Sequence, residues 1–202
     1  MSWNLRLFEK YRTGISRIVA VFLFLVLIFT RTRIESDLAK AILNNFGLFL
    51  ITLCVFGRVW SSLYISGKKT TMIVKDGPYS VVRNPLYLCS YLGVLGISLA
   101  TENLFLIVLL NAAFLLYYPF VILSEEKKLT EMHGESFTQY MQQTPRIIPR
   151  FSILTQPETY EVHVHIFTNA LRDAIWFYIA YIAIDFIKLA QSKGIVSFVI
   201  DF

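Results

Sequence analysis

Long apolar runs separated by short polar segments dominate the chain. The apolar runs cover residues 15–29, 41–65, 85–100, 104–123 and, more briefly, 174–187. A helix needs about 20 consecutive apolar residues to cross the hydrocarbon core of a bilayer. The run 104–123 has this length. We predict spanning helices over the first four runs, and we expect the fifth either to span with a tilt or to lie along the interface. This pattern predicts an all-α, multi-pass integral membrane protein with four to five transmembrane helices.

The composition supports this interpretation. Over 202 residues, 55% are hydrophobic and 16% are charged, and the mean hydropathy is +0.56. Soluble domains carry about 45–50% apolar and about 25% charged residues, so this chain has too few polar residues to cover a soluble surface. No repeat or low-complexity linker divides the sequence, which predicts a single domain over residues 1–202.

The net charge of +5 and the pI near 9.2 do not indicate nucleic-acid binding. The basic residues form short clusters between the apolar runs and do not make one continuous face, which is typical of membrane topology. With the N-terminus placed in the cytoplasm, most Lys and Arg residues fall on the cytoplasmic side. The positive-inside rule therefore predicts that the polar loops 66–84 and 124–165 are cytoplasmic. Cys54 and Cys89 lie within apolar runs, and we expect their small side chains to pack between helices.

Two sequence blocks carry a specific resemblance. The first, residues 77–87, reads GPYSVVRNPLY, and the second combines SEEKKL at 124–129, HGESFTQY at 133–140 and TPRIIP at 144–149. In this order they resemble the isoprenylcysteine carboxyl methyltransferase family, which comprises integral membrane S-adenosylmethionine-dependent enzymes related to the phospholipid N-methyltransferases. The resemblance covers roughly residues 55–150.

The resemblance implies a cytoplasmic pocket for S-adenosylmethionine. Many members of the family have His where this chain has Asn84, and because Asn does not titrate near neutral pH, we expect it to position the cofactor. By resemblance, the cofactor-binding residues are Tyr79, Arg83, Asn84, Pro85, Tyr87, Glu125, Glu126 and Tyr140.

These residue types suit the cofactor. A carboxylate such as Glu125 or Glu126 is able to hold the ammonium group or the ribose hydroxyls of the cofactor, and Arg83 is able to pair with its carboxylate. The tyrosines offer faces for its adenine ring and its sulfonium cation. The structural alternatives are that the two glutamates are interfacial helix residues and that Arg83 is only a positive-inside anchor.

The predicted reaction is carboxyl O-methylation of an isoprenylcysteine or an analogous lipid acid. It needs an ionised carboxylate and a basic residue to hold it, for which the candidates are Arg58 and Arg146. Arg58 is otherwise expected to snorkel to the headgroups. The alternative is phospholipid N-methylation, with Glu126 as the base. An NADPH-dependent sterol-type reductase and a non-enzymatic membrane scaffold rank lower.

Other polar residues predict structural roles. Asn111 is expected to form an interhelical hydrogen bond, and Asp173 and Asp185 are expected to face a polar interface. His163 and His165 lack the further ligands that a metal site needs. The expected partners are a lipophilic or lipidated substrate and membrane lipids, without nucleic acid or metal. We expect the protein in the plasma or inner membrane of a bacterium, or in the endoplasmic reticulum of a eukaryote.

Overall fold

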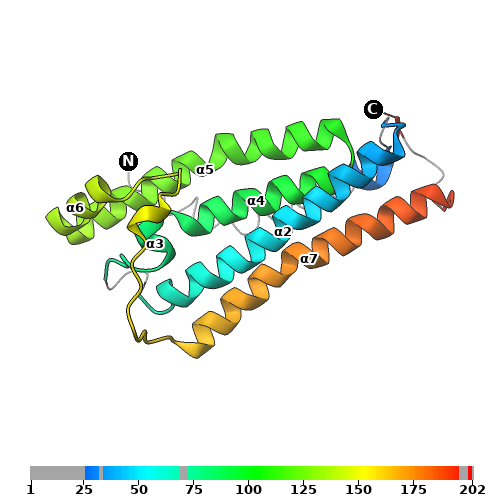
Figure 1. Ribbon diagram of the computed structural model, residues 1–202. Coiled ribbons are helices and arrows are strands. Elements are labelled where there is room, and N and C mark those ends of the chain that lie inside the picture. The colour runs from blue at the N-terminus through cyan, green and yellow to red at the C-terminus, as the bar shows by residue number, and fades with distance from the viewer. Residues whose placement is uncertain (1–25, 32–33, 69–71, 196–199, 202) are drawn as a thin grey trace.

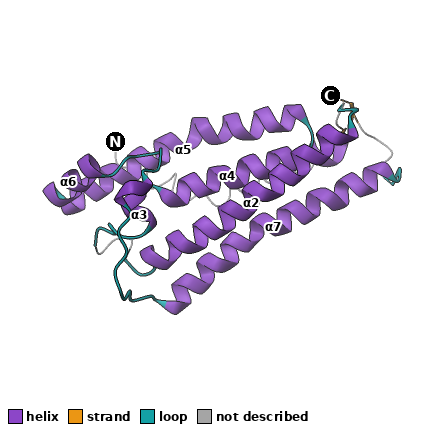
Figure 2. Ribbon diagram, viewed as in Figure 1, coloured by secondary structure: helices purple, strands orange, loops and turns teal. Residues whose placement is uncertain are grey.

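The structure is a computed structural model that describes residues 26–31, 34–68, 72–195 and 200–201. It is a bundle of roughly aligned helices (Figures 1 and 2). The long elements are α2 (Asp37–Ile65), α4 (Pro85–Ala100), α5 (Leu104–His133) and α7 (Val164–Ser192). At one end, which we call the α3 end, lie α3 (Pro78–Val81), α6 (Glu135–Gln143) and the 3-10 turn η1 (Phe151–Ile153). At the far end, β1 (Thr30–Arg31) pairs in parallel with β2 (Ile200–Asp201).

The helix boundaries follow from local sequence. The side chain of Ser36 caps α2 by accepting from the amide of Ala39, and Asn103 caps α5 by accepting from the amide of Leu106. Pro85 occupies the first turn of α4, where its missing N–H costs no hydrogen bond. As a result α4 coincides with the predicted run 85–100, and residues 101–103 form the predicted turn.

Two helices are longer than the apolar runs predicted. The sequence placed the end of the fourth run at residue 123, but α5 continues to His133 because Glu, Lys and Leu are strong helix formers in water as well. The fifth run was predicted over 174–187, whereas α7 covers 29 residues and lies along α2 and α4. Hydropathy marks only the apolar middle of each helix, so it underestimated both.

The closest helix contact joins α2 to α4. A Cβ atom added to Gly47 would come within 2.6 Å of the Gly96 carbonyl oxygen, so small residues let the two backbones approach. Further along the same contact, the sulfur of Cys54 packs against Gly93 and that of Cys89 packs against Gly57. The predicted packing role of the two cysteines is confirmed.

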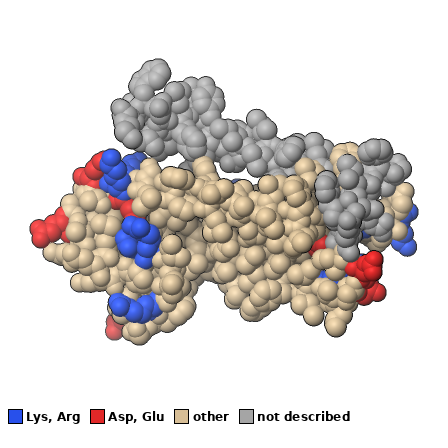
Figure 3. Space-filling model, turned by 90° about the horizontal axis from the view of Figure 1, so that it is seen from above, with Lys and Arg blue, Asp and Glu red and all other residues tan. Residues whose placement is uncertain are grey.

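The surface of the bundle fits a membrane. Among the described residues, α2 and α5 are long and apolar enough to cross one, and only 22% and 6% of their apolar windows are buried. The core helix of a soluble protein would instead be mostly buried. On the face that Figure 3 shows, the visible Lys, Arg, Asp and Glu side chains lie toward the two ends, with an uncharged band between them.

The predicted number of spanning helices goes beyond these two. The run 15–29 lies outside the described residues as far as residue 25, and α4 is apolar but has 16 residues. The total of four to five spans therefore stays a prediction. The predicted interhelical hydrogen bond of Asn111 is confirmed, since its Nδ2 donates to Ser98 Oγ of α4 at 2.9 Å.

A charge cluster links three elements at the far end of the bundle. Lys188 Nζ of α7 lies 2.7 Å from Glu102 Oε1, 3.0 Å from Asp185 Oδ1 and 3.2 Å from Asn44 Oδ1 of α2. Glu102 belongs to the α4–α5 turn and has a positive φ of 53°. These four residues, which we call the far-end cluster, fasten α7 to α2 and to the turn.

Candidate functional site

The first sequence block folds into a tight corner between α2 and α4. Gly77 has a φ of 59°, and a Cβ there would lie 2.4 Å from the ring of Tyr64, so this position requires glycine on two grounds. Pro78 starts α3, and the chain leaves it in an extended conformation at Val82. This corner carries Arg83 to the neighbourhood of α5.

Glu126 of α5 lies at the centre of the polar contacts, with its side chain only 7% exposed. Arg146 donates from Nε to both carboxylate oxygens at 3.3 and 3.1 Å, and its Nη2 lies 2.8 Å from Oε2. Arg83 Nη1 lies 3.3 Å from Oε1, and Asn84 Nδ2 donates to the same oxygen at 3.0 Å. A buried carboxylate needs such partners. Glu126 thus joins the two sequence blocks.

The segment 145–155, which we call the strap, crosses the corner and fixes it. The carbonyl of Pro145 accepts from the amide of Arg83 at 2.9 Å. The amide of Arg150 donates to the carbonyl of Val81 at 3.0 Å. The strap therefore holds the backbone on both sides of Val82, which keeps the Arg83 side chain directed at α5.

Two buried tyrosines stand beside this contact. The hydroxyl of Tyr140 in α6 donates to the carbonyl of Tyr79 at 2.7 Å. Burial raises the pKa of Tyr79 and the pKa of Tyr140 above the ordinary value of a phenol, so both hydroxyls stay protonated near neutral pH. The hydroxyl of Tyr79 has no hydrogen-bond partner among the described residues and is available to a ligand.

A cavity of about 280 Å³ lies between this corner and the helices α2, α4 and α5. Its volume is close to the lower end of the range of about 300–1,000 Å³ that small-molecule sites occupy. Its lining combines aromatic, aliphatic and charged side chains. The lining residues are Arg58, Ile65, Tyr79, Arg83, Asn84, Pro85, Leu86, Tyr87, Ser90, Tyr118, Glu125, Lys128, Leu129 and Met132.

The cavity lining includes a carboxylate and several unused donors. Glu125 accepts a hydrogen bond from the hydroxyl of Tyr87 at 2.7 Å. Three buried donors have no partner in the described part of the chain: the hydroxyl of Tyr79, the Nε of Arg83 and the Nε of Arg58. Because buried polar atoms are nearly always paired in folded proteins, three such donors around one cavity indicate a place for a polar ligand.

Arg58 lies in the apolar part of the site. It donates from Nη1 to Ser90 Oγ at 2.6 Å, and its guanidinium lies 5.6 Å from the centre of the Phe177 ring in α7. No acidic side chain of the described residues pairs with it, in contrast to Arg83 and Arg146. Its charge is therefore available to an anion inside the bundle.

These groups fit the chemistry of S-adenosylmethionine. The cofactor presents a sulfonium cation, an ammonium, a carboxylate, ribose hydroxyls and an adenine ring. Among the described lining residues, Glu125 supplies a carboxylate, the unused guanidinium nitrogen of Arg83 is a donor for an anion, and the rings of Tyr79 and Tyr118 are aromatic. The donors left without partners would be satisfied by a ligand of this kind.

The structure brings most of the predicted site residues to one cavity. Those that line it are Arg58, Tyr79, Arg83, Asn84, Pro85, Tyr87 and Glu125. Glu126 and Tyr140 lie behind it, at an adjoining cavity of about 50 Å³. Arg146 lines neither, because its guanidinium is directed at Glu126. The binding roles of all these residues stay predictions.

Sequence reasoning missed several lining residues. Ser90 follows Tyr87 by three residues on α4, and Leu129 and Met132 follow Glu125 by four and seven on α5. Residues at these spacings share one face of a helix, so extending each motif by helical periodicity would have found them. Tyr118 lies seven residues before Glu125 and belongs to the same face.

Comparisons with known proteins agree with the arrangement of the two blocks. Residues 16–136 match the model of the phospholipid methyltransferase family. The protein-S-isoprenylcysteine O-methyltransferase of Schizosaccharomyces pombe is 29% identical over 94 residues, which are 46% of this chain and 40% of that protein. No solved structure matches the chain.

Two bacterial relatives cover nearly the whole chain. The nickel-cobalt-cadmium resistance protein of Alcaligenes xylosoxydans xylosoxydans is 37% identical over 192 residues, which are 95% of this chain and 90% of that protein. The cobalt-zinc-cadmium resistance protein of Cupriavidus metallidurans is 35% identical over 191 residues, 95% of this chain and 88% of its own length.

Proposed function

Because the chain belongs to the phospholipid methyltransferase family, we propose that it transfers the methyl group of S-adenosylmethionine to a lipophilic acceptor in a membrane. The reaction takes place at the cavity between α2, α4 and α5. The observation that carries this proposal is the buried Glu126, which binds Arg83 and Asn84 of one sequence block and Arg146 of the other. That contact places both blocks beside one cavity with unused donors.

The cofactor, when bound, supplies an electrophilic methyl group on a cationic sulfur. The methyl carbon would pass to a lone pair of the acceptor, and the sulfur would retain the electrons of the broken carbon–sulfur bond. This displacement needs alignment and exclusion of water more than covalent help. Arg83 and Glu125 would hold the polar ends of the cofactor, and the lining tyrosines would flank its rings and cation.

The acceptor that the site favours is a lipophilic acid. Arg58 faces the cavity from a membrane-crossing helix and has no acidic partner in the described part of the chain, so a carboxylate there would neutralise it. Arg146, the other basic candidate, already binds Glu126 and is the poorer choice. Oxygen methylation of an ionised carboxylate also needs no general base, which suits a cavity whose described lining residues include no histidine.

Nitrogen methylation of an aminophospholipid is the alternative reaction. It needs a base for the ammonium proton, and Glu126 is poorly suited because both of its oxygens accept from Arg146 and one also contacts Arg83 and Asn84. Glu125, which lines the cavity, is the better candidate for that step. Incubation with radiolabelled cofactor and membrane lipids separates the two reactions. Methyl esters release labelled methanol in mild base, and methylamines do not.

Binding of S-adenosylmethionine, measured by calorimetry in detergent and in lipid nanodiscs, tests the proposal. The native protein should bind it, and Arg83→Ala and Glu126→Ala should abolish binding while remaining monodisperse. Lys188→Met, in the far-end cluster, is the matched control and should bind normally. A native protein that binds no S-adenosylmethionine in either medium would refute the methyltransferase. NADPH would then be the ligand to test for a reductase, and a scaffold would bind neither.

We also propose that the methyl transfer serves resistance to divalent metal ions, because two relatives that match 95% of the chain are named as nickel-cobalt-cadmium and cobalt-zinc-cadmium resistance proteins. Direct metal binding is not favoured, since among the described residues no three His, Cys, Asp or Glu side chains are grouped to hold an ion. A host strain lacking the protein should become sensitive to nickel, cobalt or cadmium. Native protein should restore growth and Arg83→Ala should fail, whereas rescue by Arg83→Ala would separate resistance from catalysis.

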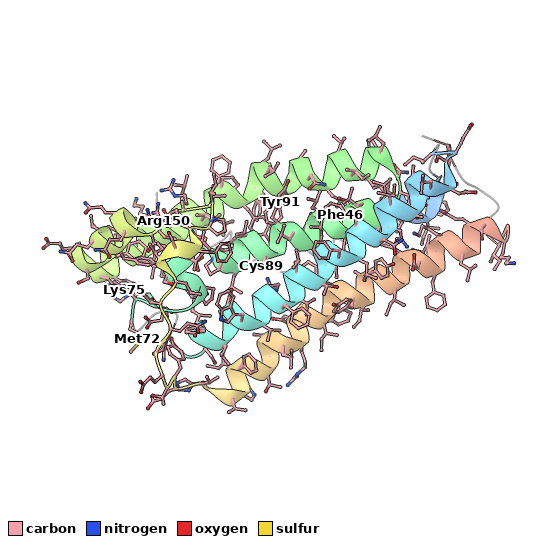
Figure 4. All side chains as sticks on the ribbon, viewed as in Figure 1. Phe46, Met72, Lys75, Cys89, Tyr91 and Arg150 are labelled. Atoms are coloured by element: carbon pink, nitrogen blue, oxygen red, sulfur yellow. The ribbon has the colours of Figure 1, made fainter. Side chains whose placement is uncertain are left out.

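The α3 end is proposed to face the cytoplasm, where the cofactor is made. The basic residues that support this orientation include Lys75, Lys127, Lys128 and Arg150. Figure 4 shows Lys75 and Arg150 near α3 and Phe46 toward the opposite end. Labelling of an introduced Lys75→Cys by a membrane-impermeant thiol reagent should require opened cells. Labelling in intact cells would reverse the orientation.

A further inference from the structure

The strap exposes large apolar side chains that no described residue covers. Ile148 is 80% exposed, Phe151 is 68% exposed and Ile147 is 59% exposed. They fall within five consecutive positions outside the long helices, so they form one patch and not scattered single residues. A patch of this kind on an ordered segment marks an interaction surface.

The strap presents this patch from a fixed backbone. Pro145 and Pro149 flank the two isoleucines and restrict the chain on both sides. Further along, the amide of Thr155 donates to Ser80 Oγ at 3.0 Å, and its carbonyl accepts from the amide of Gly77 at 2.7 Å. The apolar side chains thus point outward from a segment that is tied to the corner at α3.

The strap also lies where the apolar surface of the bundle ends. Figure 1 shows the chain turning back from α6 beside α5, and the contact between Arg146 and Glu126 fixes that neighbourhood. Leu123, one turn before Glu126 on α5, is 49% exposed, and Phe120 is 73% exposed. The apolar patch of the strap therefore stands next to the membrane-facing surface of α5.

We propose that the strap is an interfacial membrane-binding segment, with Ile147, Ile148 and Phe151 inserted at the headgroup–acyl boundary of a phospholipid bilayer. The strap is not helical apart from η1, and irregular backbone is excluded from the hydrocarbon core because its polar groups would lose water. Its depth is therefore the interface, where water still reaches the backbone and apolar side chains enter the lipid.

Arg150 supplies the charge that this position requires. It is exposed, and its Nη2 donates to the carbonyl of Gln143 at 2.8 Å. No acidic side chain of the described residues pairs with it, so its charge is available to lipid phosphate. A consequence, which rests on the proposed function, is that the strap fixes the cavity at the bilayer boundary. Water-soluble cofactor and lipophilic acceptor meet there.

Nitroxide labels on the strap test this inference without any ligand. Ile148→Cys and Phe151→Cys are labelled separately in nanodiscs of phosphatidylcholine and phosphatidylglycerol, and collisions with oxygen and with a water-soluble nickel chelate are measured. Both labels should collide more with oxygen than with the chelate. A label on Glu158→Cys, which is exposed in the polar segment that follows, should collide more with the chelate than with oxygen. The ratio of oxygen collisions to chelate collisions should differ several-fold between this label and the two labels on the strap. Native protein, whose cysteines pack between α2 and α4, provides the blank.

Two outcomes would overturn the inference. Labels at 148 and 151 that meet the chelate as readily as the label at 158 would place the strap in water. Labels that are immobilised and shielded from both reagents would show a protein partner or a second copy on the patch. Neither outcome depends on cofactor binding, so the inference and the methyltransferase reaction fail independently. Since both substituted positions are exposed, one variant remains available if the other does not fold.

Discussion

Buried or half-buried charge clusters lie at both ends of the bundle, but their surroundings differ. At the α3 end, Glu126 is held by Arg83, Asn84 and Arg146. Arg83 and Asn84 also line the cavity of about 280 Å³. The far-end cluster around Lys188 joins α7 to α2 and to the α4–α5 turn, and none of its four residues lines that cavity.

The comparison shows how a structural charge cluster differs from a candidate site. Each cluster satisfies its own carboxylates, so ion pairing alone does not distinguish them. Among the described residues, unused donors occur at both ends: the Nε of Arg83 and the hydroxyl of Tyr79 at the α3 end, and the Nδ2 of Asn103 beside Glu102 at the far end. Arg83 and Tyr79 line the cavity, whereas Asn103 does not. Unused donors next to an open volume indicate a ligand-binding site, whereas a cluster that only joins helices indicates a structural role.

The largest effect is expected from Glu126→Ala. Removal of this carboxylate leaves the half-buried Arg83 and the guanidinium of Arg146 without their anion, which should cost about 3 kcal/mol of stability and abolish binding of S-adenosylmethionine. Thermal unfolding in detergent and calorimetry measure the two losses. Glu126→Gln retains the shape and should lose less stability. Full cofactor affinity in Glu126→Ala would separate the cluster from the site.

Lys188→Met should destabilise the protein without affecting the cofactor. It removes the cation shared by Glu102 and Asp185, and because Asp185 is 42% exposed, the loss should be smaller, about 2 kcal/mol. The melting temperature should fall while the dissociation constant of S-adenosylmethionine stays unchanged. A weakened dissociation constant would mean that the far end communicates with the cavity, and the contrast between the ends would not hold.

Tyr87→Phe should weaken cofactor binding with little change in stability. It removes the hydrogen bond of 2.7 Å that orients Glu125 in the cavity, which is worth about 1.5 kcal/mol, or roughly tenfold in the dissociation constant. Tyr91→Phe is the matched control, because Tyr91 lies on the same helix, packs on Phe114 of α5 and is outside the cavity lining. An equal loss of cofactor affinity in Tyr87→Phe and Tyr91→Phe would assign Tyr87 a packing role.

The smallest effect concerns pH. Burial raises the pKa of Tyr140 in the folded state above the value of about 10 that it has when unfolded. Its contribution to stability is therefore complete below that pH and is lost as the pH rises further. The melting temperature of native protein should fall more steeply above about pH 10 than that of Tyr140→Phe. Parallel curves for the two proteins would contradict this assignment.

The sequence predicted helices wherever their signals are local. Pro85 and Asn103 mark the starts of α4 and α5, and the turn 101–103 follows from its polar residues. The prediction from hydropathy missed the last ten residues of α5 and both ends of α7, because hydropathy follows apolar content and these parts of the helices are polar. Helix propensity and packing extend them.

The sequence by itself determined the apolar helices, the two blocks and half of the residues that line the cavity. Those features depend on composition and on residue types at fixed spacing. Only the tertiary structure decided how the charges pair. Arg146 was a candidate for holding the acceptor, but it binds Glu126, twenty residues earlier in the chain, and Arg58 remains without an acidic partner among the described residues. Pairing depends on which side chains meet across helices, and spacing along one chain does not encode that distance.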